Sequence, residues 1–493
     1  MTAGPTTTEH HERIAPARMR GLRELIAEVE ALPVDHPDYV ELRHLVAGVY
    51  KTVKERRRAE KRAEVLAHDT AVTELTATGA PGRIDDETAG IPLVSSAPGA
   101  IAGHLKQPRG CYMCKERYTQ VDAFYHQLCP ACAAFSHGKR DARCDLTGRR
   151  ALLTGGRAKI GMYIALRLLR DGAHLTITTR FPNDAARRFM QVDDSADWID
   201  RLRVVGLDLR DPAQVVALAD DVAALGPLDI IVNNAAQTVR RTPQAYAPLV
   251  AAEREPLPAG TRPELVTFQR DDGLMLPGAS EDAAGAVAHW APTPHALAQL
   301  ATTARSATFD LVDQGRAIDA GGLVPDVVDA NSWVQTVEEV DPIELLEVQL
   351  CNQTAPFILL SRLRPQLAAA AKAAPSERSY VVNVSAMEGV FGRGYKGAGH
   401  PHTNMAKAAL NMLTRTSAQE LFESDRILMT AVDTGWITDE RPHPDKLRLA
   451  ADGFHAPLDL VDGAARVYDP IVRGEAGEDL HGVFLKDYRV GDW

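Results

Sequence analysis

Two pairs of cysteines, each in a Cys-x-x-Cys arrangement, could hold a metal ion. Cys111 pairs with Cys114, and Cys129 pairs with Cys132. Each short loop lets two thiolates reach the same ion, so the two pairs together supply the four sulfur ligands of a tetrahedral zinc site. Because four protein ligands leave no open position on the ion, we expect a structural site in which Zn²⁺ folds a small module over residues 106–145.

Other roles for this segment stay open at this point. The cysteines could be unconnected reduced thiols, or one pair could be redox-active, although a redox pair would not require a matching second pair. His126, His137 and Cys144 are alternative ligands, or else packing and surface residues. Four aromatic residues could stack on nucleic-acid bases or form the core of the module: Tyr112, Tyr118, Phe124 and Tyr125. The formal net charge of −11 argues against nucleic-acid binding by the whole protein.

A second group of residues could bind phosphate. Residues 154–161, Thr-Gly-Gly-Arg-Ala-Lys-Ile-Gly, follow the apolar run 151–153 and precede a helical pattern and the β-branched run 174–179. Strand, turn, helix and strand in this order make a βαβ unit, whose glycines let the backbone approach a pyrophosphate at a helix N-terminus. Further strands are expected at 204–209 and 228–232. This alternation predicts an α/β fold with a doubly wound, parallel, Rossmann-type sheet that binds its ligand at the carboxyl ends of the strands.

The other segments frame this core. Residues 1–70 carry apolar side chains at helical spacing and predict a helical N-terminal region, in which a basic stretch is a solvated helix face or a surface for an acidic partner. Residues 71–105 are rich in Ala, Thr, Gly and Pro and predict a linker. The dinucleotide-binding domain is expected at 146–493, interrupted by an insertion at about 239–335. This insertion, with a helix-friendly stretch at 280–302, is expected to be a substrate lid, a partner-docking element or an inert segment.

Composition sets the class of protein. Hydrophobic residues make up 45% and charged residues 25% of the chain, as in ordinary soluble globular proteins. No apolar run approaches the roughly 20 residues of a membrane helix. The N-terminus lacks a basic start followed by an apolar stretch, so no secretory signal is predicted and the expected location is cytoplasmic.

Taken together, these motifs resemble those of the short-chain dehydrogenase/reductase family. Residues 154–161 are similar to its Thr-Gly-x-x-x-Gly-x-Gly turn, with Lys159 in place of the middle glycine, and residues 233–236 are similar to its Asn-Asn-Ala-Gly element. Ser385 and Lys407 match the family's catalytic Ser and Lys. The resemblance covers roughly residues 146–238 and 336–493.

The resemblance also implies which residues bind the dinucleotide. Asp208 occupies the acidic position that touches adenine in the family. The loop with Gly435 and Thr438 is similar to the segment that holds the nicotinamide amide, although Thr434 replaces its proline. The expected set is Thr154, Gly155, Arg157, Lys159, Ile160, Gly161, Arg180, Asp208, Asn234, Ala235, Lys407, Gly435 and Thr438.

Two basic positions favour the phosphorylated cofactor. Family members with a basic residue inside the turn and an Arg just after the second strand tend to use NADP(H), and Lys159 and Arg180 stand at these positions. An Asp at the end of the second strand would repel a 2′-phosphate, whereas an Arg can pair with it through two hydrogen bonds. We therefore expect NADP as the cofactor.

The family's proton donor is missing. In the family a Tyr stands four residues before the Lys, and here that position holds Thr403, whose aliphatic hydroxyl is a much poorer acid than a phenol. Substitutes within reach are Tyr395, His400, His402 and Glu388, of which His402 is best placed because it adjoins Thr403. The candidate catalytic residues are then Asn352, Ser385, His402, Thr403 and Lys407.

Two functions follow from the resemblance. The first is an NADP(H)-dependent oxidoreductase with a rebuilt proton donor, acting on a small molecule that the sequence does not identify. The alternative is a non-catalytic dinucleotide-binding sensor or scaffold that acts through a protein partner. Because the family commonly forms dimers and tetramers, a homo-oligomer is also implied.

Overall fold

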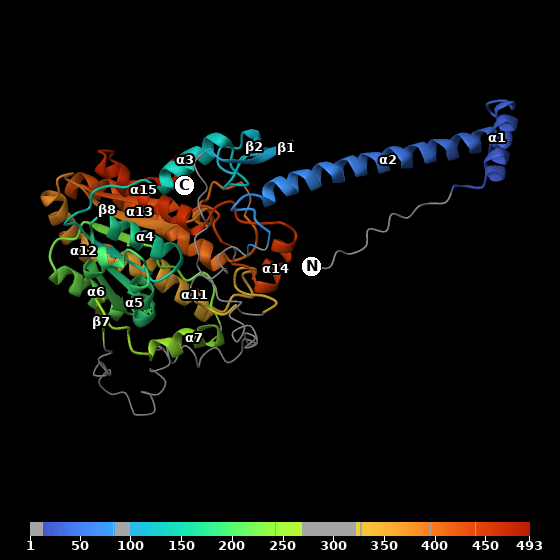
Figure 1. Ribbon diagram of the computed structural model, residues 1–493. Helices are drawn as coiled ribbons and strands as arrows, with labels where there is room; N and C mark the ends of the chain where they lie inside the picture. Colours follow the sequence, from blue (N-terminus) through green and yellow to red (C-terminus); the bar gives the residue numbers. More distant parts are fainter. Residues whose placement is uncertain are drawn as a thin grey trace. The chain divides into compact units, whose positions relative to one another are not determined.

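The chain falls into two compact units, residues Met1–Thr70 and Ala71–Trp493, in a computed structural model (Figure 1). The structure describes residues 13–81, 83, 99–241, 243–268, 322–325, 328–394, 396–438 and 440–493. The first unit consists of α1 (Pro16–Glu30) and most of α2 (Pro37–Glu74), and a proline in the first turn starts α1. The predicted helical N-terminal region is thus confirmed.

A nine-stranded sheet is the centre of the second unit. Its described strands follow the order β11-β10-β9-β8-β6-β3-β4-β5-β7, and each neighbouring pair is parallel except β10 with β11. The bounds are β3 Arg150–Leu153, β4 His174–Thr179, β5 Leu202–Gly206, β6 Ile230–Asn233, β7 Glu264–Thr267, β8 Ser379–Ser385, β9 Ile427–Asp433, β10 Phe484–Lys486 and β11 Arg489–Gly491.

Helices cover both faces of this sheet (Figure 1). Ala151 and Leu153 of β3 pack on one side with α4 (Lys159–Arg170), α5 (Pro182–Met190) and α15 (Leu460–Glu475). Leu152 packs on the other side with α6 (Pro212–Ala224) and α12 (Ala355–Ala373), where α13 (Pro401–Asp425) also lies. Because successive strand residues point to opposite faces, strands covered on both sides are apolar throughout. The expected doubly wound α/β fold is confirmed.

Several further elements of the second unit are short. They are α7 Pro243–Glu253, α11 Pro342–Gln349, α14 His443–Ala451, a π-helical turn at Leu350–Thr354 and 3₁₀ turns at Ser195–Asp197, Ile199–Arg201 and Met387–Gly389. Among the residues that the structure describes, no helix combines the length and apolar character needed to cross a membrane.

Two strand predictions need adjustment. The strand expected at 204–209 begins at Leu202 and ends at Gly206, after which the chain leaves the sheet and carries Asp208 out of it. The strand expected at 228–232 occupies Ile230–Asn233.

The sheet also reaches into the predicted insertion. Strand β7 (Glu264–Thr267) pairs with β5 and forms an edge of the sheet, a role that the sequence did not indicate. The helix-friendly stretch at 280–302 lies outside the described residues.

The four-cysteine segment folds as a hairpin and a helix. Strand β1 (Ile101–Gly110) pairs antiparallel with β2 (Arg117–Asp122), and α3 (Pro130–Arg140) follows. The ends of the expected linker 71–105 are therefore regular structure, since α2 continues to Glu74 and β1 begins at Ile101. Three of the aromatic residues are buried in the core of this hairpin-and-helix module: Tyr118, Phe124 and Tyr125.

Candidate functional site

A cavity of about 1030 Å³ opens at the carboxyl ends of the central strands. Loops that follow β3, β4, β5, β6, β8 and β9 form its walls together with the first turns of α13. Most of the expected site residues line it: Gly155, Arg157, Lys159, Ile160, Gly161, Arg180, Asp208, Asn234, Ala235, Ser385, Thr403, Lys407, Gly435 and Thr438. The structure thus brings the two ends of the expected dinucleotide site into one space.

The Gly-rich turn needs two of its glycines for steric reasons. Gly155 has a φ of +71°, and a Cβ at Gly161 would lie 2.0 Å from the carbonyl oxygen of Gly155. Lys159 stands where the family has its middle glycine, and its φ of 53° is in the left-handed region that favours glycine. The backbone at Lys159 therefore has a conformation that glycine adopts more readily than lysine.

Thr154 lies behind the wall of the cavity and ties two loops together. Its Oγ1 accepts hydrogen bonds from the backbone N–H groups of Asn234 and Ala235, each at 3.0 Å. The side-chain Nδ2 of Asn234 also donates hydrogen bonds to the carbonyl oxygens of Thr154 and Gly155, each at 3.1 Å. These bonds fix the Gly-rich turn against the loop after β6.

Arg180 lies at the end of β4 and meets a side chain from the predicted insertion. Its guanidinium donates to the hydroxyl of Tyr246 at 3.2 Å and lies over the Tyr246 ring, 5.1 Å from the ring centre. The Tyr246 ring stacks on that of Phe181 at 6.0 Å. Arg157 pairs with Asp184 close by. The result is a basic and aromatic corner of the cavity.

Asp208 reaches the cavity with its charge already compensated. Its carboxylate accepts hydrogen bonds from the guanidinium of Arg210, with one distance of 2.9 Å, and from the backbone N–H of Arg210 at 3.0 Å. Burial acts to raise the pKa of the Asp208 carboxyl, but the bonds and charge of Arg210 outweigh it and the pKa is lowered. Arg210 also donates to Glu347 at 2.9 Å.

Lys407 and Ser385 lie at the other end of the cavity. The ammonium of Lys407 donates to the carbonyl oxygen of Val384 at 2.8 Å, and burial lowers its pKa to about 8. Ser385 donates to Oδ1 of Asn411 at 2.5 Å. Asn411 was missed at the sequence level, although its position four residues after Lys407 places the two on the same face of α13.

Asn352 is buried and does not form part of the described cavity wall. It lies in the π-helical turn Leu350–Thr354, where its Oδ1 accepts from the N–H of Gln237 at 2.7 Å and its Nδ2 donates to the Gln237 carbonyl at 2.9 Å. Its side chain therefore holds the loop after β6, and Gln237 itself lines the cavity.

The four candidate replacements for the missing Tyr lie in different surroundings. His402 is only 1% exposed, does not line the cavity as described, and has no partner for either ring nitrogen among the described residues. Burial lowers its pKa. Glu388 lines the cavity and pairs with Arg393 at 3.3 Å, and Tyr395 lies outside the described residues.

His400 lines the cavity in a fixed orientation. Its Nδ1 is 2.8 Å from the carbonyl oxygen of Trp333, and its ring stacks on the Trp333 ring at 4.0 Å with an angle of 7°. Because a carbonyl can only accept, Nδ1 of His400 carries the hydrogen of this bond. Thr403 also lines the cavity, and its Oγ1 has no hydrogen-bond partner in the described part of the chain.

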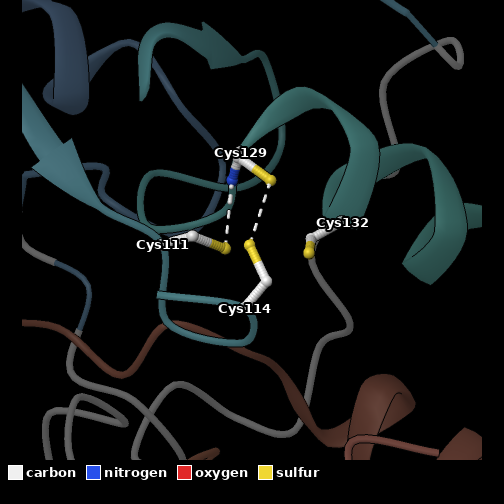
Figure 2. A group of neighbouring side chains, drawn as sticks. All are labelled: Cys111, Cys114, Cys129 and Cys132. Carbon is white, nitrogen blue, oxygen red and sulfur yellow. Dashed lines mark hydrogen bonds between the residues drawn. The ribbon is translucent and has the colours of Figure 1, made fainter. Parts of the chain in front are cut away.

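The four cysteines converge on one point (Figure 2). Their Sγ atoms all lie within 4.8 Å of one another. The Sγ of Cys111 accepts a hydrogen bond from the N–H of Cys129 at 3.3 Å, and the Sγ atoms of Cys114 and Cys129 are 3.7 Å apart. The donor set and its spacing fit a tetrahedral ion with four sulfur ligands. The three alternative ligands are engaged elsewhere: His126 bonds to Thr78, His137 to Asp122, and the Cys144 thiol lies 3.3 Å from the Tyr468 hydroxyl.

Comparison with known proteins finds a family similarity in one segment of the chain. Residues 149–250 match the family model described as short chain dehydrogenase. Over this segment the chain is similar to the short-chain dehydrogenase/reductase family. A probable oxidoreductase of Streptomyces antibioticus is 43% identical over 91 residues, which are 18% of this chain and 30% of that protein.

Two further matches cover larger shares of the chain. An uncharacterized protein of Acanthamoeba polyphaga mimivirus is 29% identical over 376 residues, which cover 74% of this chain and 71% of that protein. The Pseudomonas aeruginosa RhlG/NADP active-site complex is 19% identical, covers 69% of this chain and 95% of that chain, and has a TM-score of 0.41.

Proposed function

We propose that the protein is an NADP(H)-dependent oxidoreductase that interconverts a carbonyl group and an alcohol on a small molecule. The observation that carries the proposal is the single cavity that joins the Gly-rich turn and Arg180 at one end to Ser385 and Lys407 at the other. A dinucleotide laid along this cavity would have its phosphates at the N-terminus of α4 and its nicotinamide near Gly435 and Thr438.

The preference for the phosphorylated cofactor is supported by the charges of the adenosine end. Arg180 at the end of β4 presents a planar guanidinium that can pair with a 2′-phosphate, and Lys159 of the Gly-rich turn lines the same cavity, where it pairs with Glu440 at 3.9 Å. The one carboxylate expected there, that of Asp208, is held by Arg210 and would repel a phosphate less than a free one.

His400 is the best-supported proton donor. When bound, NADPH would supply a hydride to the carbonyl carbon. The Nε2–H bond of protonated His400 would break, its electron pair would stay on nitrogen, and the proton would join the substrate oxygen. Ser385 would position that oxygen, and Lys407 would hold the ribose. His402 is buried and is not among the residues that line the cavity, so in our proposal it has a packing role, while Thr403 would leave room for the imidazole of His400.

We further propose that the four cysteines hold a structural Zn²⁺. The metal would be closed to substrate because Cys111, Cys114, Cys129 and Cys132 supply all of its ligands. The alternative function, a dinucleotide-dependent sensor acting on a protein partner, is favoured by one observation, the absence of a phenol at Thr403.

Turnover separates these two functions. Purified protein is supplied with NADPH and a panel of aldehydes, ketones and quinones, and NADPH consumption is followed by absorbance. We expect His400→Gln to reduce consumption at least about tenfold because it removes the proton donor, and Ser385→Ala to do so because it removes the group that positions the substrate oxygen. NADPH binding without consumption across the panel would contradict the enzyme and favour the sensor.

A further inference from the structure

The four-cysteine module shares its hydrophobic core with the walls of the dinucleotide cavity. Leu105, Val121 and Leu128 of the module pack with Leu458 and Ile437 of the dehydrogenase domain. Ile437 immediately precedes Thr438, and Ile160 of the Gly-rich turn packs against the same core. The module therefore packs against the Gly-rich turn and against the loop that contains Ile437, the two segments that are expected to touch the cofactor.

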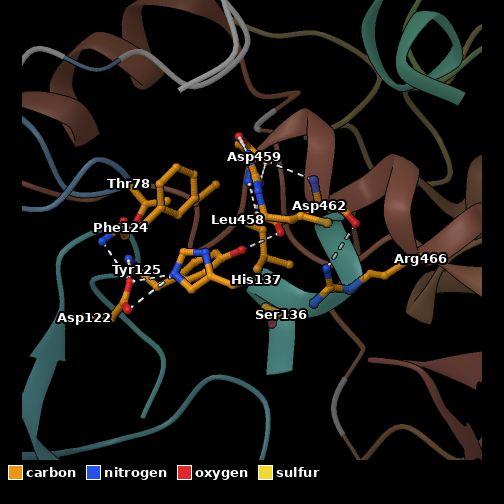
Figure 3. Close-up of polar contacts among 12 residues, drawn as sticks. Thr78, Asp122, Phe124, Tyr125, Ser136, His137, Leu458, Asp459, Asp462 and Arg466 are labelled. Carbon is orange, nitrogen blue, oxygen red and sulfur yellow. Dashed lines mark hydrogen bonds and ion pairs between the residues drawn. The ribbon is translucent and has the colours of Figure 1, made fainter. Parts of the chain in front are cut away.

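Polar contacts anchor the module on the N-terminal turns of α15 (Figure 3). The Tyr125 hydroxyl donates to Asp462 at 2.7 Å, and the Arg140 guanidinium donates to Asp459 at 2.6 Å and pairs with Asp462 at 3.1 Å. Arg83, which precedes the module in the chain, donates to the carbonyl oxygen of Leu458 at 2.9 Å. Because these partners are buried, the module is held in a defined position on the domain.

One residue of the module enters the cavity itself. Tyr112 stands between the ligands Cys111 and Cys114 and lines the cavity wall. Its hydroxyl oxygen accepts a hydrogen bond from the backbone N–H of Trp436 at 2.9 Å. Trp436 belongs to the loop of residues 433–438, hereafter the nicotinamide loop, that follows β9.

The other described supports of the nicotinamide loop come from the dehydrogenase domain. Asp433 accepts a hydrogen bond from the N–H of Gly435 at 3.2 Å, and its second oxygen accepts from Lys486 at 3.0 Å. Lys486 also lies 5.9 Å from the centre of the Tyr112 ring. The phenol of Tyr112 therefore completes a set of contacts that fixes the backbone of the loop.

We propose that the module is a metal-dependent positioning element of the dinucleotide site and that Tyr112 is its positioning residue. An ion bound by Cys111 and Cys114 would fix the loop between them, and with it the phenol that holds Trp436. Loss of the ion would free this loop and leave the Trp436 N–H without its acceptor. The nicotinamide loop would then lose its preorganised backbone, and the nicotinamide end of the cofactor would bind less tightly.

The inference rests on the proposed dinucleotide binding and is tested with two matched variants. Tyr112→Phe removes the hydroxyl that accepts from Trp436, whereas Tyr118→Phe removes a hydroxyl of the same module that donates to the His126 carbonyl at 3.0 Å. Zinc content and thermal stability are measured for both. Dissociation constants are determined for NADPH and for 2′,5′-ADP, which carries the adenosine end without a nicotinamide.

We expect Tyr112→Phe to raise the Kd for NADPH by about fivefold to tenfold, the effect of leaving one backbone N–H unpaired. The Kd for 2′,5′-ADP should stay within about twofold of the wild-type value, since this ligand does not reach the nicotinamide loop. Tyr118→Phe should change neither constant. Zinc-free full-length protein should show the pattern of Tyr112→Phe, and added Zn²⁺ should restore wild-type binding.

Three results would overturn the inference. Equal NADPH affinity of the wild type and Tyr112→Phe would remove the positioning role, and equal weakening by Tyr118→Phe would reduce it to a general effect on module stability. Loss of 2′,5′-ADP affinity in parallel with that for NADPH would show that the whole site is disturbed. If wild-type protein binds neither NADPH nor NADH, the proposed function fails as well, so the two failures are distinguishable.

Discussion

Replacement of Lys407 by Met should stabilise the protein near neutral pH. The Lys407 ammonium is buried, and burial lowers its pKa from 10.5 to about 8. One pKa unit corresponds to about 1.4 kcal/mol, so the buried ammonium costs the folded state about 3 kcal/mol at neutral pH. Methionine has a similar length and no charge. Loss of the hydrogen bond to the Val384 carbonyl offsets about 1 kcal/mol of the stability that removal of the charge adds.

The pH dependence follows from proton binding by the two states. The unfolded chain keeps the Lys407 proton up to about pH 10.5, whereas the folded chain releases it near pH 8. Between these two pH values the unfolded state binds more protons than the folded state. The free energy of unfolding of the wild type therefore increases as pH rises from about 8 to about 10.5. The advantage of Lys407→Met should therefore be fully present below about pH 8 and lost towards about pH 10.5.

Chemical denaturation followed by tryptophan fluorescence measures this difference in cofactor-free protein. Wild type, Lys407→Met and the control Lys372→Met, at an exposed position of α12, are compared between about pH 7 and about pH 10. We expect the control to follow the wild type throughout. A Lys407→Met variant that is less stable than the wild type at pH 7, or whose advantage does not change with pH, would refute the account of a costly buried ammonium.

Three further predictions concern the cofactor, the catalytic end and the metal. Arg180→Ala should raise the Kd for NADPH by about 10-fold to 100-fold, as expected for a lost charge-assisted pair, and that for NADH by much less. If fluorescence titrations showed that Arg180→Ala weakens NADPH and NADH binding equally, a contact between Arg180 and the 2′-phosphate would be contradicted. Asn411→Ala should lower kcat by about tenfold with an unchanged Kd for NADPH, because Ser385 loses the acceptor that orients it, and an unchanged kcat would count against this role. Cys114→Ser should abolish stoichiometric zinc by elemental analysis and lower the Tm, whereas retained zinc would contradict a four-sulfur site.

The fold was predictable where its signals are local. The βαβ unit carries its strand, turn and helix within residues 151–179, and the same short motifs indicated the doubly wound sheet. Strand β7 was not predictable, since Glu264–Thr267 is four residues long and its partner β5 lies far away in sequence. A short edge strand of this kind has no periodicity that separates it from a loop.

The site was predictable in its motif residues but not in its long-range contacts. Ser385 and Lys407 follow from family spacing, and the structure places both at the cavity. The choice between His400 and His402 depends on the contact of His400 with Trp333, a residue 67 positions away in the sequence. The hydrogen bond from Trp436 to Tyr112 joins residues more than 300 positions apart. Neither segment carries a sequence motif that predicts it.

The most direct measurement of the central claim is a titration of the purified wild-type protein with NADPH and with NADH, followed by nicotinamide fluorescence. A cavity that joins Arg180 to Lys407 predicts saturable NADPH binding that is at least about tenfold tighter than NADH binding, the difference expected for one charge-assisted pair with the 2′-phosphate. Binding of neither nucleotide would contradict the account of a working dinucleotide site.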